Sequence, residues 1–245
     1  MSGLWLAIDT ATDLASVAAG EPPTTRAAAQ ARGARRHAAE ILGLVEATLG
    51  RLRLRPRDLD GIVVGDGPGS FTGLRIGWAA AKGLAQEAGL ELVAVPSLMA
   101  AAGGGGARHS LGAAPIAACF DALRGQVFGA LYAFHPDRVD TLVAPAVLTM
   151  AEFARVAPMR PALVVGDGAV RYADEVTVWS GRAPGSLDRE GSSLGASMLL
   201  ALLERPGAAR RISDLGAAEP VYGRAAEAQV KWEARHGRPL PDPSR

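Results

Sequence analysis

Residues 61–84 constrain the fold more than any other stretch, because three kinds of pattern follow one another there without a gap. An apolar run at 61–65 predicts a buried strand, and the glycine- and proline-rich residues 66–70 predict a tight turn. Helical spacing resumes after the turn, where Ser70 or Thr72 is expected to cap the helix. The stretch therefore predicts a buried strand that leads through a tight turn into a helix.

The tight turn has two interpretations. Backbone amides at a helix start point towards one position and can bind an anion, so Gly67, Gly69 and Ser70 are candidate phosphate-binding residues. The Gly-Lys-Ser/Thr sequence of a P-loop does not follow, however, and glycine is also required where a turn needs unusual backbone angles. A purely structural turn is the favoured interpretation, and an anion site is the alternative.

The predicted helix carries small residues on one face. Gly73, Gly77 and Ala81 recur at every fourth position and therefore share that face. A glycine inside a helix costs about 1 kcal/mol relative to alanine, so close packing is expected to compensate. The helix that packs there belongs either to this chain or to a partner, and the sequence does not choose between them.

The order of predicted elements occurs twice along the chain. In each half, three strands precede a helix, a buried strand and a glycine-rich turn, which indicates an α/β fold that arose by duplication. The consecutive glycines at 103–106 predict a flexible connection, since glycine disfavours regular structure. We expect an N-terminal lobe at 1–103, a C-terminal lobe at 104–224, and a terminal helix with a disordered tail at 225–245.

Composition excludes several classes of protein. A net charge of +1 argues against a strongly basic platform for nucleic acid, and the single cysteine, Cys119, excludes both an internal disulfide and a cysteine cluster for zinc. The N-terminus lacks the pattern of a signal peptide, and the chain lacks an apolar run long enough to span a membrane. We therefore expect a soluble protein of the cytoplasm.

Four segments together resemble the TsaB family, also called YeaZ. They are residues 6–12, 67–77, 166–168 and 219–224, and they occur in the family's order over almost the whole chain. The resemblance implies a member of the actin, sugar-kinase and Hsp70 (ASKHA) superfamily, with two RNase-H-like lobes in tandem. This implied fold agrees with the duplicated order of elements.

The resemblance also implies a function in making threonylcarbamoyladenosine in tRNA, next to the anticodon. The chain would be the non-catalytic subunit that binds and activates the transferase TsaD, and the ATPase TsaE would join the assembly. Contact with tRNA would be indirect, and the protein alone would form a homodimer. No cofactor would be required, although ATP or ADP could bind at the partner interface.

Two helices are expected to form the partner surface, in a four-helix arrangement with the matching helices of TsaD. The expected contact residues are His37, Ile41 and Val45 on the first helix and Gly73, Gly77, Trp78 and Ala81 on the second. A bulky residue in place of Gly77 is therefore expected to abolish the complex while the monomer stays folded.

The resemblance also explains why no catalytic residue is expected. TsaD-like relatives carry two histidines four residues apart that can share a metal ion, and Ser97 and Ala101 occupy these positions here. The four histidines are His37, His109, His135 and His236, and they are too scattered in sequence to form a metal-binding set. Neither a catalytic site nor a metal site is therefore expected.

Asp9 and its neighbours support an alternative function. In the superfamily a carboxylate at this strand end lies near nucleotide-bound magnesium, so Asp9, Thr10 and Thr12 are candidate nucleotide-binding residues. The other interpretation is that they only form a hairpin. The alternative function is a stand-alone ASKHA-type ATP-dependent phosphotransferase, or a metallopeptidase-like enzyme.

Asp121 is the equivalent carboxylate of the second half. The family usually continues with Ala-Arg and later a Glu. Here Leu123 stands at the position of the Arg and Gln126 at the position of the Glu. The role of Asp121 and of the hairpin that follows it is therefore open.

Overall fold

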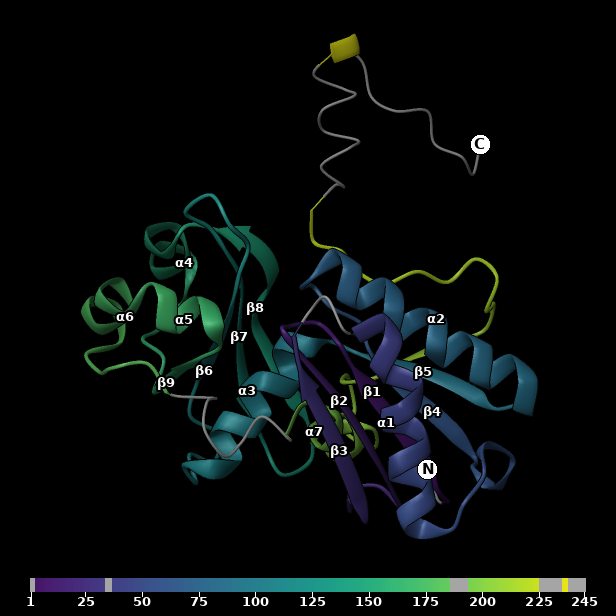
Figure 1. Ribbon diagram of the computed structural model, residues 1–245. Coiled ribbons are helices and arrows are strands. Elements are labelled where there is room, and N and C mark those ends of the chain that lie inside the picture. Colours follow the sequence, from purple (N-terminus) through teal and green to yellow (C-terminus); the bar gives the residue numbers. More distant parts are fainter. Residues whose placement is uncertain (1–2, 34–36, 186–193, 225–234, 238–245) are drawn as a thin grey trace.

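The computed structural model describes residues 3–33, 37–185, 194–224 and 235–237, and it contains two β-sheets with helices around and between them (Figure 1). The apolar runs form the central strands of both sheets, where they are buried. The expected α/β fold is confirmed. The expected helix and tail at 225–245 lie outside the described residues, apart from 235–237.

The first sheet has six strands: β1 (Trp5–Asp9), β2 (Leu14–Gly20), β3 (Ala27–Arg32), β4 (Gly61–Gly65), β5 (Glu91–Val95) and β10 (Arg210–Ile212). Their order is β10-β5-β4-β1-β2-β3. β2 is antiparallel to β1 and β3, whereas β4 is parallel to β1 and β5. Because β1 and β4 are parallel, the end of β1 and the glycine-rich turn lie at the same edge of the sheet.

The second sheet has four strands: β6 (Ile116–Asp121), β7 (Val127–Phe134), β8 (Val139–Leu148) and β9 (Leu163–Val165). Their order is β8-β7-β6-β9, with antiparallel pairs up to β6 and a parallel pair of β6 and β9. This repeats the arrangement of β3-β2-β1-β4. The repeated topology confirms the two RNase-H-like lobes.

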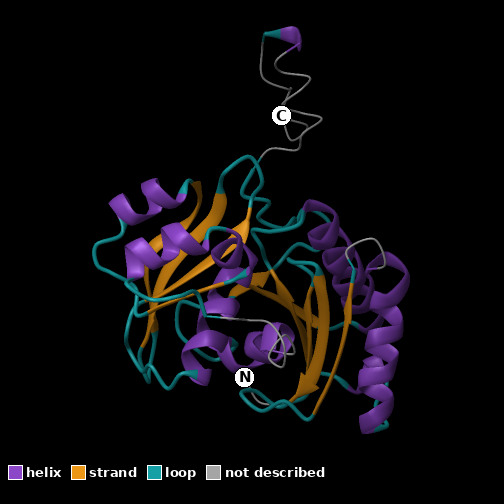
Figure 2. Cartoon of the chain, turned by 60° about the vertical axis from the view of Figure 1, so that its left-hand side comes forward, coloured by secondary structure: helices purple, strands orange, loops and turns teal. Residues whose placement is uncertain are grey.

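The helices form layers on the sheets: α1 (His37–Leu52), the short 3₁₀ helix η1 (Pro56–Asp58), α2 (Phe71–Ala88), α3 (Ser97–Arg108), α4 (Met150–Val156), α5 (Asp167–Arg171), α6 (Ala173–Ser180) and α7 (Leu194–Leu202). α1 and α2 cover the outer face of the first sheet, and α4, α5 and α6 cover the outer face of the second (Figures 1 and 2). α3 and α7 lie between the two sheets.

One hydrophobic core joins the two lobes. It includes Val63 and Val93 of the first sheet, Ile116 and Tyr132 of the second, and Leu199 of α7. Two further cores lie under the outer helices, one on each sheet. The lobes are therefore packed on each other through a continuous apolar layer.

The glycines at 103–106 contradict one expectation, because they are buried inside α3 and do not form a flexible connection. A Cβ atom on Gly105 would lie 2.8 Å from Val165 Cγ1, and one on Gly106 would lie 2.4 Å from Ile116 Cδ1. Glycine is thus required because α3 packs closely against the second sheet. The burial of the helix offsets its low intrinsic propensity.

The two halves of the sequence do not map simply onto the two sheets. α7 packs on β1 and β2, and β10 pairs with β5 of the first sheet, although both come from the stretch 104–224 expected to form the C-terminal lobe. The chain therefore returns to the first lobe after completing the second. No helix among the described residues is long and apolar enough to cross a membrane.

Candidate functional site

The glycine-rich turn packs tightly against its own fold. Gly67 has a φ of 91°, and a Cβ atom there would lie 2.4 Å from the carbonyl oxygen of Val221. A Cβ atom on Gly69 would lie 2.2 Å from the carbonyl oxygen of Ala11. Both glycines are required by the approach of other backbone segments.

The amides of the turn are used inside the fold. Gly67 N–H donates to Ser97 Oγ at 3.3 Å, and Ser70 N–H donates to the carbonyl oxygen of Ala11 at 2.7 Å. Ser70 Oγ accepts from Gly73 N–H at 3.2 Å, which makes Ser70 the N-cap of α2 as expected. This geometry favours the structural interpretation of the turn over an anion site.

The candidate nucleotide residues lie beside this turn, at the end of β1. Asp9 Oδ1 accepts from Ala11 N–H at 3.2 Å and from Ser97 Oγ–H at 3.1 Å. Thr10 Oγ1 donates to the carbonyl oxygen of Gly73 at 2.7 Å, and Thr12 Oγ1 accepts from Leu14 N–H at 3.2 Å. The structure thus brings these residues together, but each makes a contact that stabilises the hairpin or α2.

Backbone segments close in on the Asp9 carboxylate from two sides. A Cβ atom on Gly65 would lie 2.4 Å from Asp9 Oδ1, and one on Gly195 would lie 3.0 Å from Oδ2. Burial raises the pKa of Asp9, although its hydrogen bonds act in the opposite direction. The Asp9 carboxylate is therefore closely enclosed by Gly65 at the end of β4 and by Gly195 near the start of α7.

The small-residue face of α2 points into the fold. A Cβ atom on Gly73 would lie 2.1 Å from the carbonyl oxygen of Thr10, and one on Gly77 would lie 2.2 Å from Thr10 Oγ1. Ala81 is fully buried in the core between α2 and the first sheet. The expectation that this face meets a partner is therefore corrected, because it packs on β1 and on the adjoining hairpin.

The other expected contact residues are also largely internal. Ile41, Val45 and Trp78 are buried in the core under α1 and α2, and Trp78 Nε1–H donates to the carbonyl oxygen of Gly65 at 3.2 Å. α1 begins at His37, whose side chain lies outside the described part of the chain. Helical spacing identified the apolar faces correctly, but those faces pack on the sheet of their own lobe.

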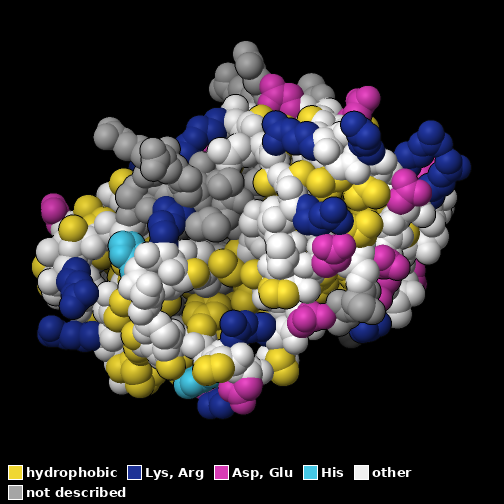
Figure 3. All heavy atoms as spheres, turned by 90° about the horizontal axis from the view of Figure 1, so that it is seen from below, with side chains coloured by type: hydrophobic (Ala, Val, Ile, Leu, Met, Phe, Trp, Pro, Cys, Tyr) yellow, Lys and Arg dark blue, Asp and Glu magenta, His cyan; other side chains and the backbone are white. Residues whose placement is uncertain are grey.

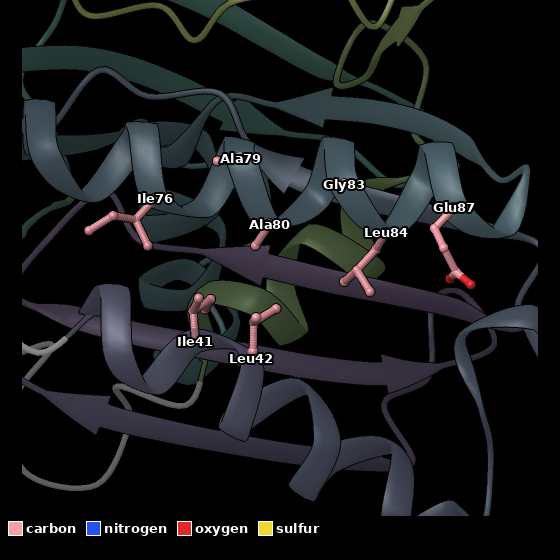
Figure 4. A pocket seen from close by; sticks show the side chains of 8 residues that line it. All are labelled: Ile41, Leu42, Ile76, Ala79, Ala80, Gly83, Leu84 and Glu87. Carbon is pink, nitrogen blue, oxygen red and sulfur yellow. The ribbon is translucent and has the colours of Figure 1, made fainter.

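A different surface is exposed between α1 and α2. It is a groove of about 570 Å³, which we call the α1–α2 groove (Figure 4). Its lining residues are Ile41, Leu42, Ile76, Ala79, Ala80, Gly83, Leu84 and Glu87. Leu42 is 58% exposed, and a Cβ atom on Gly83 would meet nothing within 4 Å.

Apart from Ile41, the residues that line the α1–α2 groove were missed from the sequence, although a signal for them exists. Ile76, Ala80, Gly83 and Glu87 follow helical spacing on α2, as a second stripe beside the buried one. In Figure 4 the side chains of Ile76 and Leu84 point towards those of α1. The groove is therefore an apolar surface built from both helices that were expected to bind the partner.

The segment that begins with β10 contacts α2 and the turn before it. We call residues 210–224 the terminal strap. Arg210 Nη2 lies 2.9 Å from Asp66 Oδ1 and 3.0 Å from Oδ2, in a partly buried pair. Burial raises the pKa of Asp66, while the charge of Arg210 acts in the opposite direction. Sequence reasoning missed this pair, because its members are far apart in the chain.

The second-lobe carboxylate lies in a polar cluster. Asp121 forms an ion pair with Arg171 at 3.3 Å, and its Oδ1 accepts from Leu123 N–H at 3.0 Å.

The positions that hold metal ligands in TsaD-like relatives do not form a metal site. Ser97, at the first of these positions, forms hydrogen bonds with Asp9 and with the Gly67 amide. Within the described residues, no three His, Cys, Asp or Glu side chains gather as a metal site would require.

One face of the molecule carries charge of both signs. On the face seen in Figure 3, basic and acidic side chains are interspersed among apolar ones. A surface of this kind does not concentrate the positive charge that a phosphate backbone attracts.

Comparisons with known proteins agree on one family. Residues 30–170, more than half of the chain, match the family model described as TsaD, tRNA N6-adenosine threonylcarbamoyltransferase. A Bacillus subtilis protein, named tRNA threonylcarbamoyladenosine biosynthesis protein TsaB, is 31% identical over 80% of this chain and 83% of its own length. The Escherichia coli protein of the same name is 35% identical over 58% of this chain and 63% of its own length. The solved structure of YeaZ from Pseudomonas aeruginosa has a TM-score of 0.70 at 28% identity, and the match covers 91% of this chain and 100% of that chain.

Proposed function

Since the chain belongs to the TsaB family of tRNA threonylcarbamoyladenosine biosynthesis proteins, we propose that it is the non-catalytic subunit that binds and activates a TsaD-like transferase. The α1–α2 groove carries this proposal. It is an apolar surface on the two helices that the family resemblance points to, and the described residues offer no assembled metal set for catalysis.

The chemistry of the groove suits a pair of partner helices. Leu42 and Leu84 supply apolar area, and Ala79, Ala80 and Gly83 keep the surface low enough for close approach. Glu87 adds one charged group to the lining. A partner with apolar helices of its own would bury this groove in a four-helix arrangement, while the small-residue face of α2 holds the helix in place from below.

Five further features belong to this proposal. A TsaE-like ATPase joins the assembly, and tRNA contact is made by the partner, in keeping with the mixed charge on the face seen in Figure 3. The protein alone forms a homodimer through the same groove, because an apolar face tends to be covered. ATP or ADP, where it binds, does so at the interface with the partner. The complex works in the cytoplasm.

Reconstituted synthesis of threonylcarbamoyladenosine tests this function. Formation of the product should require the chain together with TsaD, and the chain alone should show no turnover. Full activity in its absence would refute the proposal. Turnover by the chain alone that is lost on Asp9→Ala would instead support an independent enzyme.

One substitution tests the groove itself. Gly83→Trp should fill one end of the groove and weaken the complex with TsaD by about 100-fold or more, because the partner helix can no longer approach. The control is Gly43→Trp on α1, where a Cβ atom also meets nothing within 4 Å but the residue does not line the groove. Isothermal titration calorimetry measures both. Equal affinity of the two variants would show that the partner binds elsewhere.

A further inference from the structure

The terminal strap follows one side of α2. Lys82 Nζ donates to the carbonyl oxygens of Gly216 and Ala218 at 3.4 and 3.0 Å. Nearer the start of α2, the ring of Tyr222 lies 4.6 Å from that of Phe71. Residues 216–222 of the strap therefore run antiparallel to residues 71–82 of α2.

The strap and the α1–α2 groove use different stripes of α2. Phe71, Arg75, Trp78 and Lys82 contact the strap at helical spacing, whereas Ile76, Ala80, Gly83 and Glu87 line the groove with the same spacing five residues later. A shift of five residues turns the stripe by roughly 140° around the helix. The strap thus supports the partner-binding helix from the flank without covering the groove.

The last residues of the strap pass between the two lobes. Val221 N–H donates to the carbonyl oxygen of Asp66 at 2.8 Å, in the first lobe. Gly223 has a φ of 71°, and a Cβ atom there would lie 2.7 Å from Pro68 Cβ and 2.9 Å from Phe128 Cε1 of the second lobe. The chain can pass through this narrow place only with glycine at position 223.

Arg224 closes the strap onto the second lobe. Its Nη1 donates to the carbonyl oxygen of Ala122 at 2.9 Å, and its Nη2 donates to Gln126 Oε1. Both acceptors belong to the β6–β7 hairpin, whose tip carries three consecutive positive φ values at Leu123, Arg124 and Gly125. Such backbone angles are unfavourable for Leu and Arg, so surrounding contacts must maintain them.

We propose that Arg224 is a positioning residue of the partner-binding surface, because its contacts with Ala122 and Gln126 hold Tyr222 against the first turns of α2. This inference rests on the proposed binding of a TsaD-like partner to the α1–α2 groove. Tyr222 transmits the effect: Arg75 Nε donates to Tyr222 Oη at 3.3 Å, and the Arg75 guanidinium lies 4.3 Å from the centre of the Phe71 ring.

The rest of the strap has anchors of its own. Arg210 pairs with Asp66, and Lys82 holds residues 216 and 218. Loss of the Arg224 contacts should therefore release only the end of the strap and the first turns of α2. The fold should persist, while the binding helix loses part of its support.

The test combines three single variants and one double variant with two measurements. Arg224→Ala should weaken binding of TsaD by about 10-fold and speed amide hydrogen exchange at residues 71–76 in the chain alone. Arg224→Lys should restore binding only in part, because a lysine cannot donate from two positions of a planar fork. Gln126→Glu should slow the same exchange, because its hydrogen bond to Arg224 becomes charge-assisted, and it should have no such effect when Arg224 is replaced by alanine.

Arg205→Ala is the matched control. Arg205 also donates to backbone carbonyl oxygens, those of His135 and Pro136, which belong neither to the strap nor to the β6–β7 hairpin tip. It should leave both TsaD affinity and exchange at 71–76 unchanged. A lower melting temperature of Arg224→Ala with unchanged affinity and exchange would overturn the inference and leave Arg224 a merely structural residue.

The two proposals fail in distinguishable ways. If the wild-type chain does not bind TsaD, or if Gly83→Trp binds as well as Gly43→Trp, the proposed function of the groove is wrong. Hydrogen exchange in the chain alone still decides whether Arg224 holds α2. If only the Arg224 variants behave like wild type, the groove keeps its function and the positioning role is wrong.

Discussion

The two faces of α2 carry glycines with opposite meanings. On the inner face, Cβ atoms at Gly73 and Gly77 would come within 2.1 and 2.2 Å of Thr10. On the outer face, a Cβ atom at Gly83 would meet nothing within 4 Å. The inner glycines let α2 approach its own sheet. Gly83 instead leaves the α1–α2 groove without a protruding side chain at that position. Glycine at helical spacing therefore indicates close approach, but it does not say by what.

The strongest test of this contrast is Gly77→Leu. The new side chain would collide with Thr10, so we expect a loss of about 3 kcal/mol or more in the free energy of unfolding, or no folded protein at all. Urea unfolding followed by circular dichroism measures this. A folded monomer with unchanged stability that merely fails to bind TsaD would restore the original expectation for this face.

A second test uses the pH dependence of the free energy of unfolding. It concerns Asp9, the neighbour of Thr10 on which the inner face of α2 packs. Burial raises the pKa of Asp9 in the folded state above its unfolded value, so ionised Asp9 opposes folding at neutral pH. This penalty is relieved as the pH falls through the folded pKa towards the unfolded one. Any advantage of Asp9→Asn over wild type should therefore shrink in that window, by no more than about 1.4 kcal/mol per pH unit.

Unfolding free energies of both proteins at several pH values provide the measurement. The two curves should converge on the acid side. A difference that stays constant with pH would show that the Asp9 pKa is not raised by its surroundings.

The smallest expected effect comes from alanine on the outer face. Gly83→Ala should stabilise the chain by about 0.5–1 kcal/mol, since alanine favours a helix and the space is open. Gly77→Ala should destabilise it, because the added methyl group meets Thr10 Oγ1. The two melting temperatures should therefore move in opposite directions. A shift of the same sign in both would remove the distinction between the faces.

The sequence predicted the repeated order of strands and the strand-turn-helix unit well, because apolar runs and glycine-rich turns are local signals. It also predicted Ser70 as the cap of α2. Prediction from the sequence failed where a residue's structural role depends on a contact with a residue far away in the chain. The buried glycines of α3 and the pairing of Arg210 with Asp66 depend on contacts that no local pattern records.

The expected partner residues illustrate the same limit. An amphipathic helix shows which side is apolar, and the sequence pattern located Ile41, Val45 and Trp78 correctly on that side. It could not tell that this side packs on the chain's own sheet while a narrower stripe stays exposed. The roles of Gln126 and Arg224 likewise became visible only when the strap and hairpin were seen together.

The apolar layer between the two sheets has a mechanical consequence. A two-lobed enzyme that opens and closes needs a hinge with a wettable cleft, whereas separation of these lobes would expose Val63, Ile116, Tyr132 and Leu199 to water. At about 25 cal/mol per Å² of apolar surface, such opening is strongly opposed. The molecule should therefore move as one stiff body, in which the two lobes keep their positions relative to each other.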